Sequence, residues 1–208
     1  MQKMYIAFFV LKLFFYFVEI KLFYTFAPRK PKKNIMRVFH TQESREKELS
    51  FPQKCLREDA WLGEAYYFWK EIEDAEDWGY SSKRRTGYFE VYDCILKSEN
   101  YLDTVFNEDH YYFWLKQLEK IAKTIIKKTK EKPTLKELND YIFDRGIWRE
   151  VDFIQFQDLP TGEKHSFVKP ITYNNGKIRT IAFRKRIQIA VYNPNIIQNF
   201  SFLKQEKI

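Results

Sequence analysis

Between residues 108 and 130, apolar side chains recur every three or four positions, which is the spacing that places them on one face of an α-helix. The set is Tyr111, Trp114, Leu115, Leu118, Ile121, Ala122, Ile125 and Ile126. A second helix follows, because residues 134–137 read Thr-Leu-Lys-Glu, a capping box, and Gly146 supplies a helix-ending glycine. Both predicted helices lie in the middle of the chain, so any sheet must be built from segments on either side of them.

Segments with the composition of β-strands do lie on both sides of this helical middle. They are rich in β-branched and aromatic residues, and they cover residues 36–41, 87–96, 151–156, 178–183 and 187–192. Asn174-Asn175-Gly176 predicts a hairpin turn before the fourth of them. Between the first two strands we expect a turn at 61–68 and a helix at 70–78. The pattern predicts an α+β fold whose sheets join distant segments.

The first 35 residues differ in composition from the rest. They carry seven Lys or Arg against one Glu, a net charge of +6, so residues 36–208 contribute only +2 of the total of +8. Residues 5–27 are mostly apolar and long enough to span a bilayer, for which about 20 residues are needed, but three charges interrupt them. We predict a leader at 1–35 and one domain at 36–208. The leader is a membrane anchor, a packed helix, or sequence that precedes a natural start at Met36.

The two cysteines, Cys55 and Cys94, show neither the spacing of metal ligands nor a disulfide framework. We therefore predict no metal site and a reducing compartment. A cytoplasmic location follows, unless residues 5–27 insert into a membrane. The sequence also contains no Gly-rich phosphate loop and no signature of a Ser-His or Cys-His catalytic triad.

Three short segments carry the most specific functional signal. Residues 38–41 read Val-Phe-His-Thr, and residues 61–69 read Trp-Leu-Gly-Glu-Ala-Tyr-Tyr-Phe-Trp and precede an acidic helix. On a late predicted strand, residues 188–193 read Gln-Ile-Ala-Val-Tyr-Asn. This order resembles the ADP-ribosyltransferases, in the branch that includes diphtheria toxin and the poly-ADP-ribose polymerases, which carry a His, a Tyr and a Glu in such segments.

The resemblance implies a fold of split mixed or antiparallel sheets, with residues 108–146 as a helical insertion, and NAD as the substrate. In the family the His positions the adenosine-side ribose, the Tyr stacks on the nicotinamide ring, and the Glu contacts the nicotinamide ribose. The matching residues here are His40, Tyr67 and Gln188. The implied NAD-binding set adds Thr41, Gly63, Tyr66 and Trp78. Of these, Tyr66 or Trp78 would form the second wall of the slot that holds the ring.

The glutamine at position 188 departs from the family pattern. Its amide oxygen still accepts a hydrogen bond, but it carries no negative charge. Losing a charged group where positive charge develops in the transition state costs several kcal/mol, about a thousand-fold in rate. Glu64 is the nearest candidate to replace the charge, followed by Gln155 and Gln157. Thr41 stands where the family has Gly, and leaves the backbone groups available.

Several functions therefore stay open. The resemblance implies a mono-ADP-ribosyltransferase, such as a toxin or defence effector, that modifies a protein or a nucleic acid. An NAD- or ADP-ribose-binding module with little or no turnover also fits Gln188. A lone His on a strand and an aromatic pair such as Tyr66-Tyr67 occur as ordinary core residues too.

An interaction protein is the third alternative, with residues 5–27 binding a membrane or basic segments binding nucleic acid. Residues 116–132 hold seven Lys against two Glu, and residues 179–186 hold a tighter basic patch. A lysine-rich surface is also typical of the solvated face of an ordinary helix.

Overall fold

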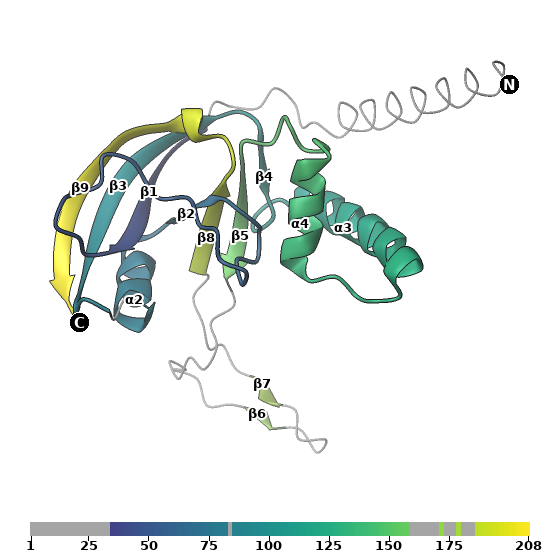
Figure 1. The fold of residues 1–208 in the computed structure, drawn as a ribbon, viewed down its shortest axis with the longest axis horizontal. Helices are drawn as coiled ribbons and strands as arrows, with labels where there is room; N and C mark the ends of the chain where they lie inside the picture. Colours follow the sequence, from purple (N-terminus) through teal and green to yellow (C-terminus); the bar gives the residue numbers. More distant parts are fainter. Residues whose placement is uncertain (1–33, 83–84, 159–170, 173–177, 180–185) are drawn as a thin grey trace, which may run out of the picture. The chain divides into compact units, whose positions relative to one another are not determined.

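The computed structural model describes residues 34–82, 85–158, 171–172, 178–179 and 186–208. The predicted leader, apart from its last two residues, the predicted turn at 174–176 and most of the predicted strand at 178–183 therefore lie outside the described residues. Helices and strands are labelled as in Figure 1. Within the described part of the chain, no helix is long and apolar enough to cross a membrane.

Seven of the described strands form one sheet in the order β4-β5-β8-β2-β1-β3-β9 (Figure 1). Three long neighbours, which we call the long half, are β1 (Asn34–Glu43), β3 (Tyr88–Ser98) and β9 (Ile197–Lys207). The other four, the short half, are β2 (Tyr66–Trp69), β8 (Arg186–Val191), β5 (Phe153–Asp158) and β4 (Tyr101–Asp103). Within this sheet β4 and β5 pair parallel and the other neighbours antiparallel. Together with the helices below, this confirms the predicted α+β class.

The two halves of the sheet meet at one registered pair, Phe39 of β1 opposite Trp69 of β2. By contrast, β1 and β3 pair without interruption from Asn34 opposite Ser98 to Glu43 opposite Phe89. These seven strands thus form one continuous sheet with a narrow junction, where the resemblance implied split sheets. The junction is narrow because β2 has only four residues, of which only the last, Trp69, is registered with β1.

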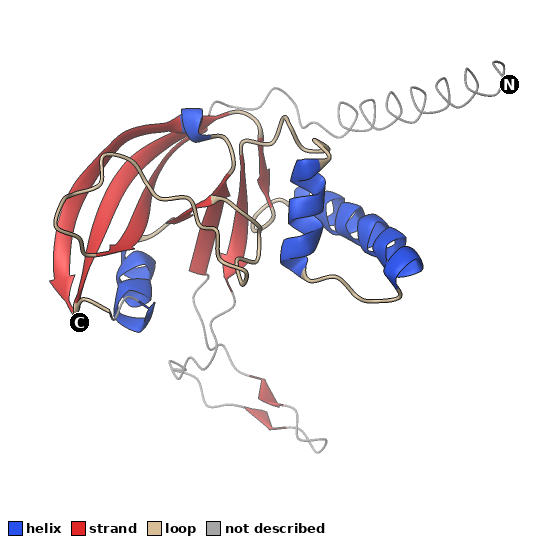
Figure 2. Ribbon diagram, viewed as in Figure 1, coloured by secondary structure: helices blue, strands red, loops and turns tan. Residues whose placement is uncertain are grey.

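Three described helices flank the sheet (Figure 2). Helix α2 (Ile72–Ser82) packs on one face, where Ala75 joins a buried cluster with Phe39, Trp69, Phe89 and Val91. Helices α3 (Glu108–Thr129) and α4 (Leu135–Asp144) lie beside the short half. The predicted capping box of α4 is confirmed, since Thr134 and Glu137 exchange side-chain to backbone hydrogen bonds.

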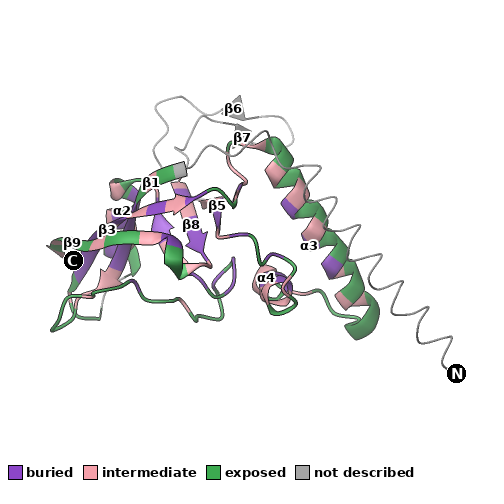
Figure 3. Ribbon diagram, turned by 90° about the horizontal axis from the view of Figure 1, so that it is seen from above, coloured by how far each residue is buried: buried purple, intermediate pink, exposed green. Residues whose placement is uncertain are grey.

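The larger core lies on the sheet face opposite α2 and takes side chains from both halves (Figure 3, purple segments of the strands). Its buried members are Val38, Phe68, Cys94, Leu96, Phe153, Ile189, Val191 and Ile196. Burial raises the pKa of Cys94 to about 12, so its thiol stays protonated and unreactive at neutral pH. This core fixes the two halves to each other more firmly than their single backbone pair does.

The sequence patterns predict neither β9 nor β4. Residues 197–207 alternate poorly and remain mostly exposed, because β9 is the edge strand of the long half. Its place is set by pairing with β3, with register shifts between Val91 and Tyr92 and between Asp93 and Ile95. Three small elements complete the described chain: η1 (Pro194–Ile196), β6 (Ile171–Thr172) and β7 (Ile178–Arg179), of which β6 and β7 pair antiparallel.

Candidate functional site

The strand order places the three predicted site segments side by side, because β8, β2 and β1 are successive neighbours. His40 lies on β1, Tyr67 on β2 and Gln188 on β8. In the ladder between β2 and β8, Gln188 pairs with Trp69. Paired residues share a face of the sheet, and so do residues two apart on one strand. Tyr67, Trp69 and Gln188 therefore point to the same face, on which Trp69 meets α2.

The ring of Tyr67 is held in place by its hydroxyl group. The hydroxyl donates a hydrogen bond to the Gly63 carbonyl at 2.8 Å and accepts one from the Leu62 backbone N–H at 3.2 Å. Tyr192, which follows β8, donates to the Leu62 carbonyl at 2.9 Å. Burial raises the pKa of Tyr67 well above its usual range, so the phenol is neutral. Tyr67 on β2 and Tyr192 just after β8 thus hold the turn that precedes β2.

The same turn is fastened to α4 from its other side. Gly63 has φ +79, a conformation that favours glycine, and a Cβ added there would lie 2.5 Å from Asp140 Oδ1. Asn139 Nδ2 donates to the Trp61 carbonyl at 3.2 Å. Sequence reasoning assigned Gly63 to NAD binding. In the structure, the absence of a side chain at Gly63 lets the turn approach α4 closely.

His40 reaches β2 through the main chain of Tyr67. Its Nδ1 lies 2.9 Å from the Tyr67 carbonyl oxygen. A carbonyl only accepts, so Nδ1 donates, and in the neutral ring Nε2 is then the acceptor nitrogen. The imidazole is 6% exposed and packs 5.6 Å from the Phe68 ring, on the face opposite the Tyr67 ring. It bridges β1 and β2 beyond their registered pair, so it takes the place of a ladder hydrogen bond.

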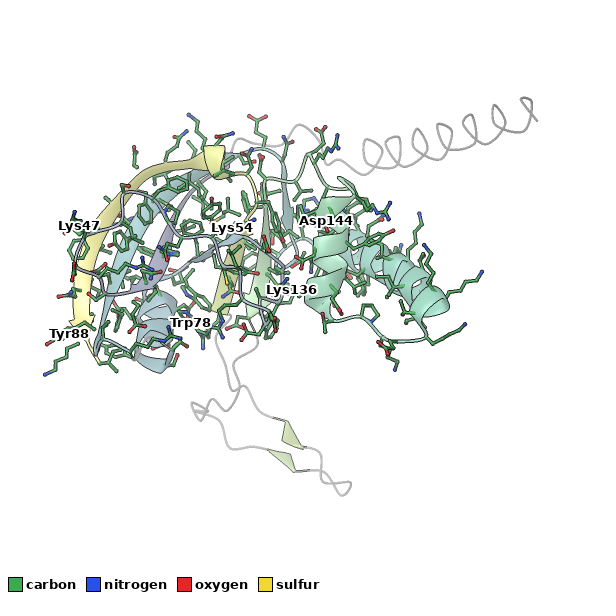
Figure 4. All side chains as sticks on the ribbon, viewed as in Figure 1. Lys47, Lys54, Trp78, Tyr88, Lys136 and Asp144 are labelled. Carbon is green, nitrogen blue, oxygen red and sulfur yellow. The ribbon has the colours of Figure 1, made fainter. Side chains whose placement is uncertain are left out.

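Two more of the predicted NAD-binding residues meet α2. Thr41 Oγ1 donates to the Ala75 carbonyl at 2.7 Å and so fastens β1 to that helix. Trp78 of α2 lies with its ring centroid 5.8 Å from that of Trp69, and Figure 4 labels it at the end of the sheet where α2 lies. Trp69 is buried under α2, and the half-buried Trp78 packs against it on the face that Tyr67 and Gln188 share.

Tyr66 is oriented differently from its neighbour. Successive side chains of a strand point to opposite faces, and Tyr66 meets the ring of Phe51 at 5.6 Å, edge to face. Tyr66 and Tyr67 therefore cannot form the two walls of one slot, which corrects one of the two predicted arrangements. Trp78 is the predicted second wall that does lie on the face of Tyr67.

Gln188 is half-buried in the middle of the short half, between β2 and β5. Its partner on β5 is Phe156. Because Gln155 and Gln157 flank Phe156 on the strand, both point to the other face and cannot replace Gln188. Glu64 is exposed and forms an ion pair of 3.0 Å with a lysine of the preceding loop. None of the three candidates that the sequence suggested, Glu64, Gln155 and Gln157, therefore lies where it could take the role of the family's Glu at position 188.

Sequence reasoning missed a charged cluster beside Gln188. Arg186 lies two residues earlier on β8 and on the same face, with its guanidinium carbon 5.0 Å from the centroid of the Trp69 ring. Its Nη2 lies 3.5 Å from Asp158 Oδ2, and its Nε lies 4.0 Å from Oδ1 of the buried Asp74. Burial raises the pKa of Asp158, and the cation of Arg186 partly opposes that rise. The predicted basic patch contained Arg186, but nothing local in the sequence indicated its carboxylate partners.

The face that α2 partly covers thus gathers three aromatic rings, one amide and an ion-paired guanidinium. Such a set suits a planar ligand that also carries hydrogen-bonding groups. In the ranges that the structure describes, no group of three or more His, Cys, Asp or Glu is placed to hold a metal ion. No protein-family model matches the chain, and no curated protein matches its sequence.

Proposed function

We propose that the domain binds NAD and transfers ADP-ribose to a macromolecular acceptor, as a mono-ADP-ribosyltransferase-like toxin or defence effector. The observation that carries this proposal is the adjacency of β8, β2 and β1. It joins three segments that are far apart in the sequence and that resemble the His, Tyr and Glu segments of one enzyme family. Two of the three side chains, Tyr67 and Gln188, share a face with Trp69 and Trp78.

In the proposed complex the Tyr67 ring stacks on the nicotinamide. Its hydroxyl is already bonded to the turn, so the ring is pre-positioned and loses little freedom on binding. Stacking an aromatic face on a cationic ring contributes about 0.5–2 kcal/mol. Gln188 accepts a hydrogen bond from the nicotinamide ribose. His40 lies buried on the opposite face of the sheet, so it does not contact the ligand there but positions Tyr67 through the bond from Nδ1 to the Tyr67 carbonyl, which corrects its predicted contact with the ribose.

A second candidate is a module that binds NAD without turnover, and Gln188 is the observation that favours it. Breaking the glycosidic bond of NAD develops positive charge on the ribose, and an amide stabilises this charge less than a carboxylate does. The nearest cluster of carboxylates, Asp74 and Asp158, is partly neutralised by Arg186. We therefore expect slow transfer from the natural sequence.

The test measures NAD binding by calorimetry and nicotinamide release from labelled NAD. Tyr67→Leu should abolish binding, whereas Tyr66→Leu, a matched change on the opposite face of the same strand, should preserve it. Gln188→Glu should raise nicotinamide release at least tenfold, because it restores the charge. Binding that survives Tyr67→Leu and is lost in Tyr66→Leu would refute the site. Binding without release in both the natural protein and Gln188→Glu would leave the module as the function.

A further inference from the structure

Helix α3 exposes most of its surface, although it is the longest helix that the structure describes. Its buried residues are Trp114, Leu118 and Ile121. From residue 122 to its end at Thr129, the helix has only exposed or half-buried side chains (Figure 3). The helix therefore packs through its first half, and its second half presents a large free surface.

Six exposed residues follow one line along this helix and onto its C-cap, Lys130, spaced four, four, three, four and three apart. At 3.6 residues per turn they fall within an arc of roughly 80°, on the side opposite the buried residues. We call them the lysine stripe; they are Tyr112, Lys116, Lys120, Lys123, Lys127 and Lys130. Between Lys116 and Lys130 the stripe spans roughly 21 Å at 1.5 Å per residue.

The charge on this surface is strongly one-sided. Residues 116–132 contain seven lysines and two glutamates, a net charge of +5. Glu119 lies next to the stripe and forms an ion pair of 2.6 Å with Lys123, which lowers the pKa of Glu119. The acidic residues of the first turn, Glu108 and Asp109, lie at the far end of the helix. Ordinary solvated helices alternate charges of both signs, whereas this face is a row of cations.

We propose that the lysine stripe binds the phosphodiester backbone of a nucleic acid. The stripe places a positive charge every 4.5–6 Å or so along a straight helix, which suits a regular polyanion. Lysine ammonium groups bind phosphates as point charges and need no particular base sequence. The expected binding is therefore independent of sequence and sensitive to salt.

A membrane surface fits α3 less well than a nucleic acid does. A helix that binds in a membrane interface inserts its apolar face among the lipids. The centre of the apolar face of α3, Trp114, Leu118 and Ile121, is already buried, with the Trp114 ring 5.4 Å from the ring of Phe156 on β5. Insertion would require this packing to break, whereas phosphate binding uses only groups that are already exposed.

The inference rests on α3 alone and requires no binding of NAD. If both proposals hold, the acceptor of ADP-ribose is a nucleic acid or a protein bound to one. Each can fail without the other, because nucleic-acid binding is measured in the absence of NAD.

The test uses fluorescence anisotropy of the full chain with a random-sequence DNA duplex and an RNA duplex of the same sequence. Between about 50 and 200 mM salt, four or five phosphate contacts give a slope of about −4 in log K against log salt. The triple variant Lys116→Gln, Lys123→Gln and Lys127→Gln should reduce that slope by about 2 to 3 and weaken binding at least tenfold.

The matched control removes the same charge elsewhere, through Lys47→Gln, Lys54→Gln and Lys207→Gln. These lysines are exposed and lie outside α3, and Figure 4 labels Lys47 at the end of the view away from α3. The control should retain affinity within about twofold. The basic first 35 residues are present in both variants, so the difference between the variants reports on α3. Comparing the two duplexes shows whether DNA or RNA is preferred.

Three outcomes would overturn the proposal. The first is an equal loss in both triple variants, which would mean that net charge alone drives binding. The second is binding of the natural chain to phosphatidylserine vesicles, lost in the α3 variant, without binding to either duplex. The third is no measurable binding to nucleic acid even at the lowest salt. Circular dichroism of each variant checks that the fold is unchanged.

Discussion

The two halves of the sheet are built on different principles. In the long half, strands of 10 and 11 residues pair along nearly their whole length. In the short half, strands of only three to six residues also pair along their length, and side-chain bonds add to these short ladders. Tyr67 and Tyr192 bond to the turn before β2, and Gln155 donates to Asp103 in β4. The long half therefore relies on long backbone ladders, and the short half on short ladders reinforced by side-chain hydrogen bonds.

The difference indicates where substitutions can alter the fold locally without unfolding it. One side-chain substitution leaves the hydrogen bonds of a backbone ladder in place, whereas it can remove a hydrogen bond that a side chain makes. The candidate residues Tyr67 and Gln188 lie in the short half, whose ladders contain fewer registered pairs than those of the long half. Three substitutions or conditions probe this division, from the largest expected effect to the smallest.

Replacing Phe68 should have the largest effect, because its ring lies in the core that both halves share. Phe68→Ala should lower the free energy of unfolding by about 3–5 kcal/mol, through lost burial and the cavity left behind. Urea unfolding followed by tryptophan fluorescence and circular dichroism measures it. Phe202→Ala, an exposed change on β9, should cost less than about 1 kcal/mol. Non-coincident transitions in the natural protein would show that the halves unfold separately, against this view of the core.

Gly63 and Gly87 form a matched pair that isolates the contact between the turn and α4. Their φ values are +79 and +77, but a Cβ would clash only at Gly63, since nothing lies within 4 Å at Gly87. Gly87→Ala should cost about 1–2 kcal/mol from backbone strain alone. Gly63→Ala should cost at least about 1 kcal/mol more, through crowding against Asp140. If Gly63→Ala and Gly87→Ala lower the free energy of unfolding equally, in thermal or urea unfolding, then Asp140 of α4 moves aside at no measurable cost.

The smallest effect concerns pH and the attachment of α3 to β4. The Asp103 backbone N–H donates to His110 Nδ1 at 3.1 Å, a bond that requires an unprotonated nitrogen. Burial lowers the pKa of His110, with Asp103 and Asp109 partly opposing the shift. The unfolded chain, with a His pKa of about 6.5, then binds more protons than the folded one. Stability should fall as the pH drops below about 6.5, by less than about 1 kcal/mol.

His110→Gln is the control for that effect. Because glutamine does not titrate, this variant should show a flatter dependence of the unfolding midpoint on pH between about 5 and 7. An identical pH dependence in the natural protein and the variant would assign the effect to other groups.

How far the sequence predicted this structure depended on the range of the interactions involved. The helix at 108–130 and the capping box at Thr134 follow from local spacing, and both are confirmed. Strand β9 was not predicted, because its polar residues signal no strand until β3 pairs with them. The adjacency of the segments of Tyr67 and Gln188 was expected only through a family resemblance.

The charged cluster around Arg186 escaped prediction for the same reason as β9. Its partners come from α2 and β5, and no spacing in the sequence links those segments. The orientation of Tyr66 was predictable in part, since neighbours on a strand face opposite ways. Predicting it required knowing that β2 begins at residue 66, whereas the sequence indicated a turn there.

The pairing of β3 with β9 also has a consequence during synthesis. Ser98 ends β3 and Ile197 begins β9, so about a hundred residues are translated between them. At about 5–20 residues translated per second, β9 is synthesised roughly 5 to 20 seconds after β3, and the outer edge of β3 stays unpaired until then. During that interval an eleven-residue strand exposes unpaired amides to other nascent chains. Rapid translation of the middle of this message would therefore favour recovery of folded protein.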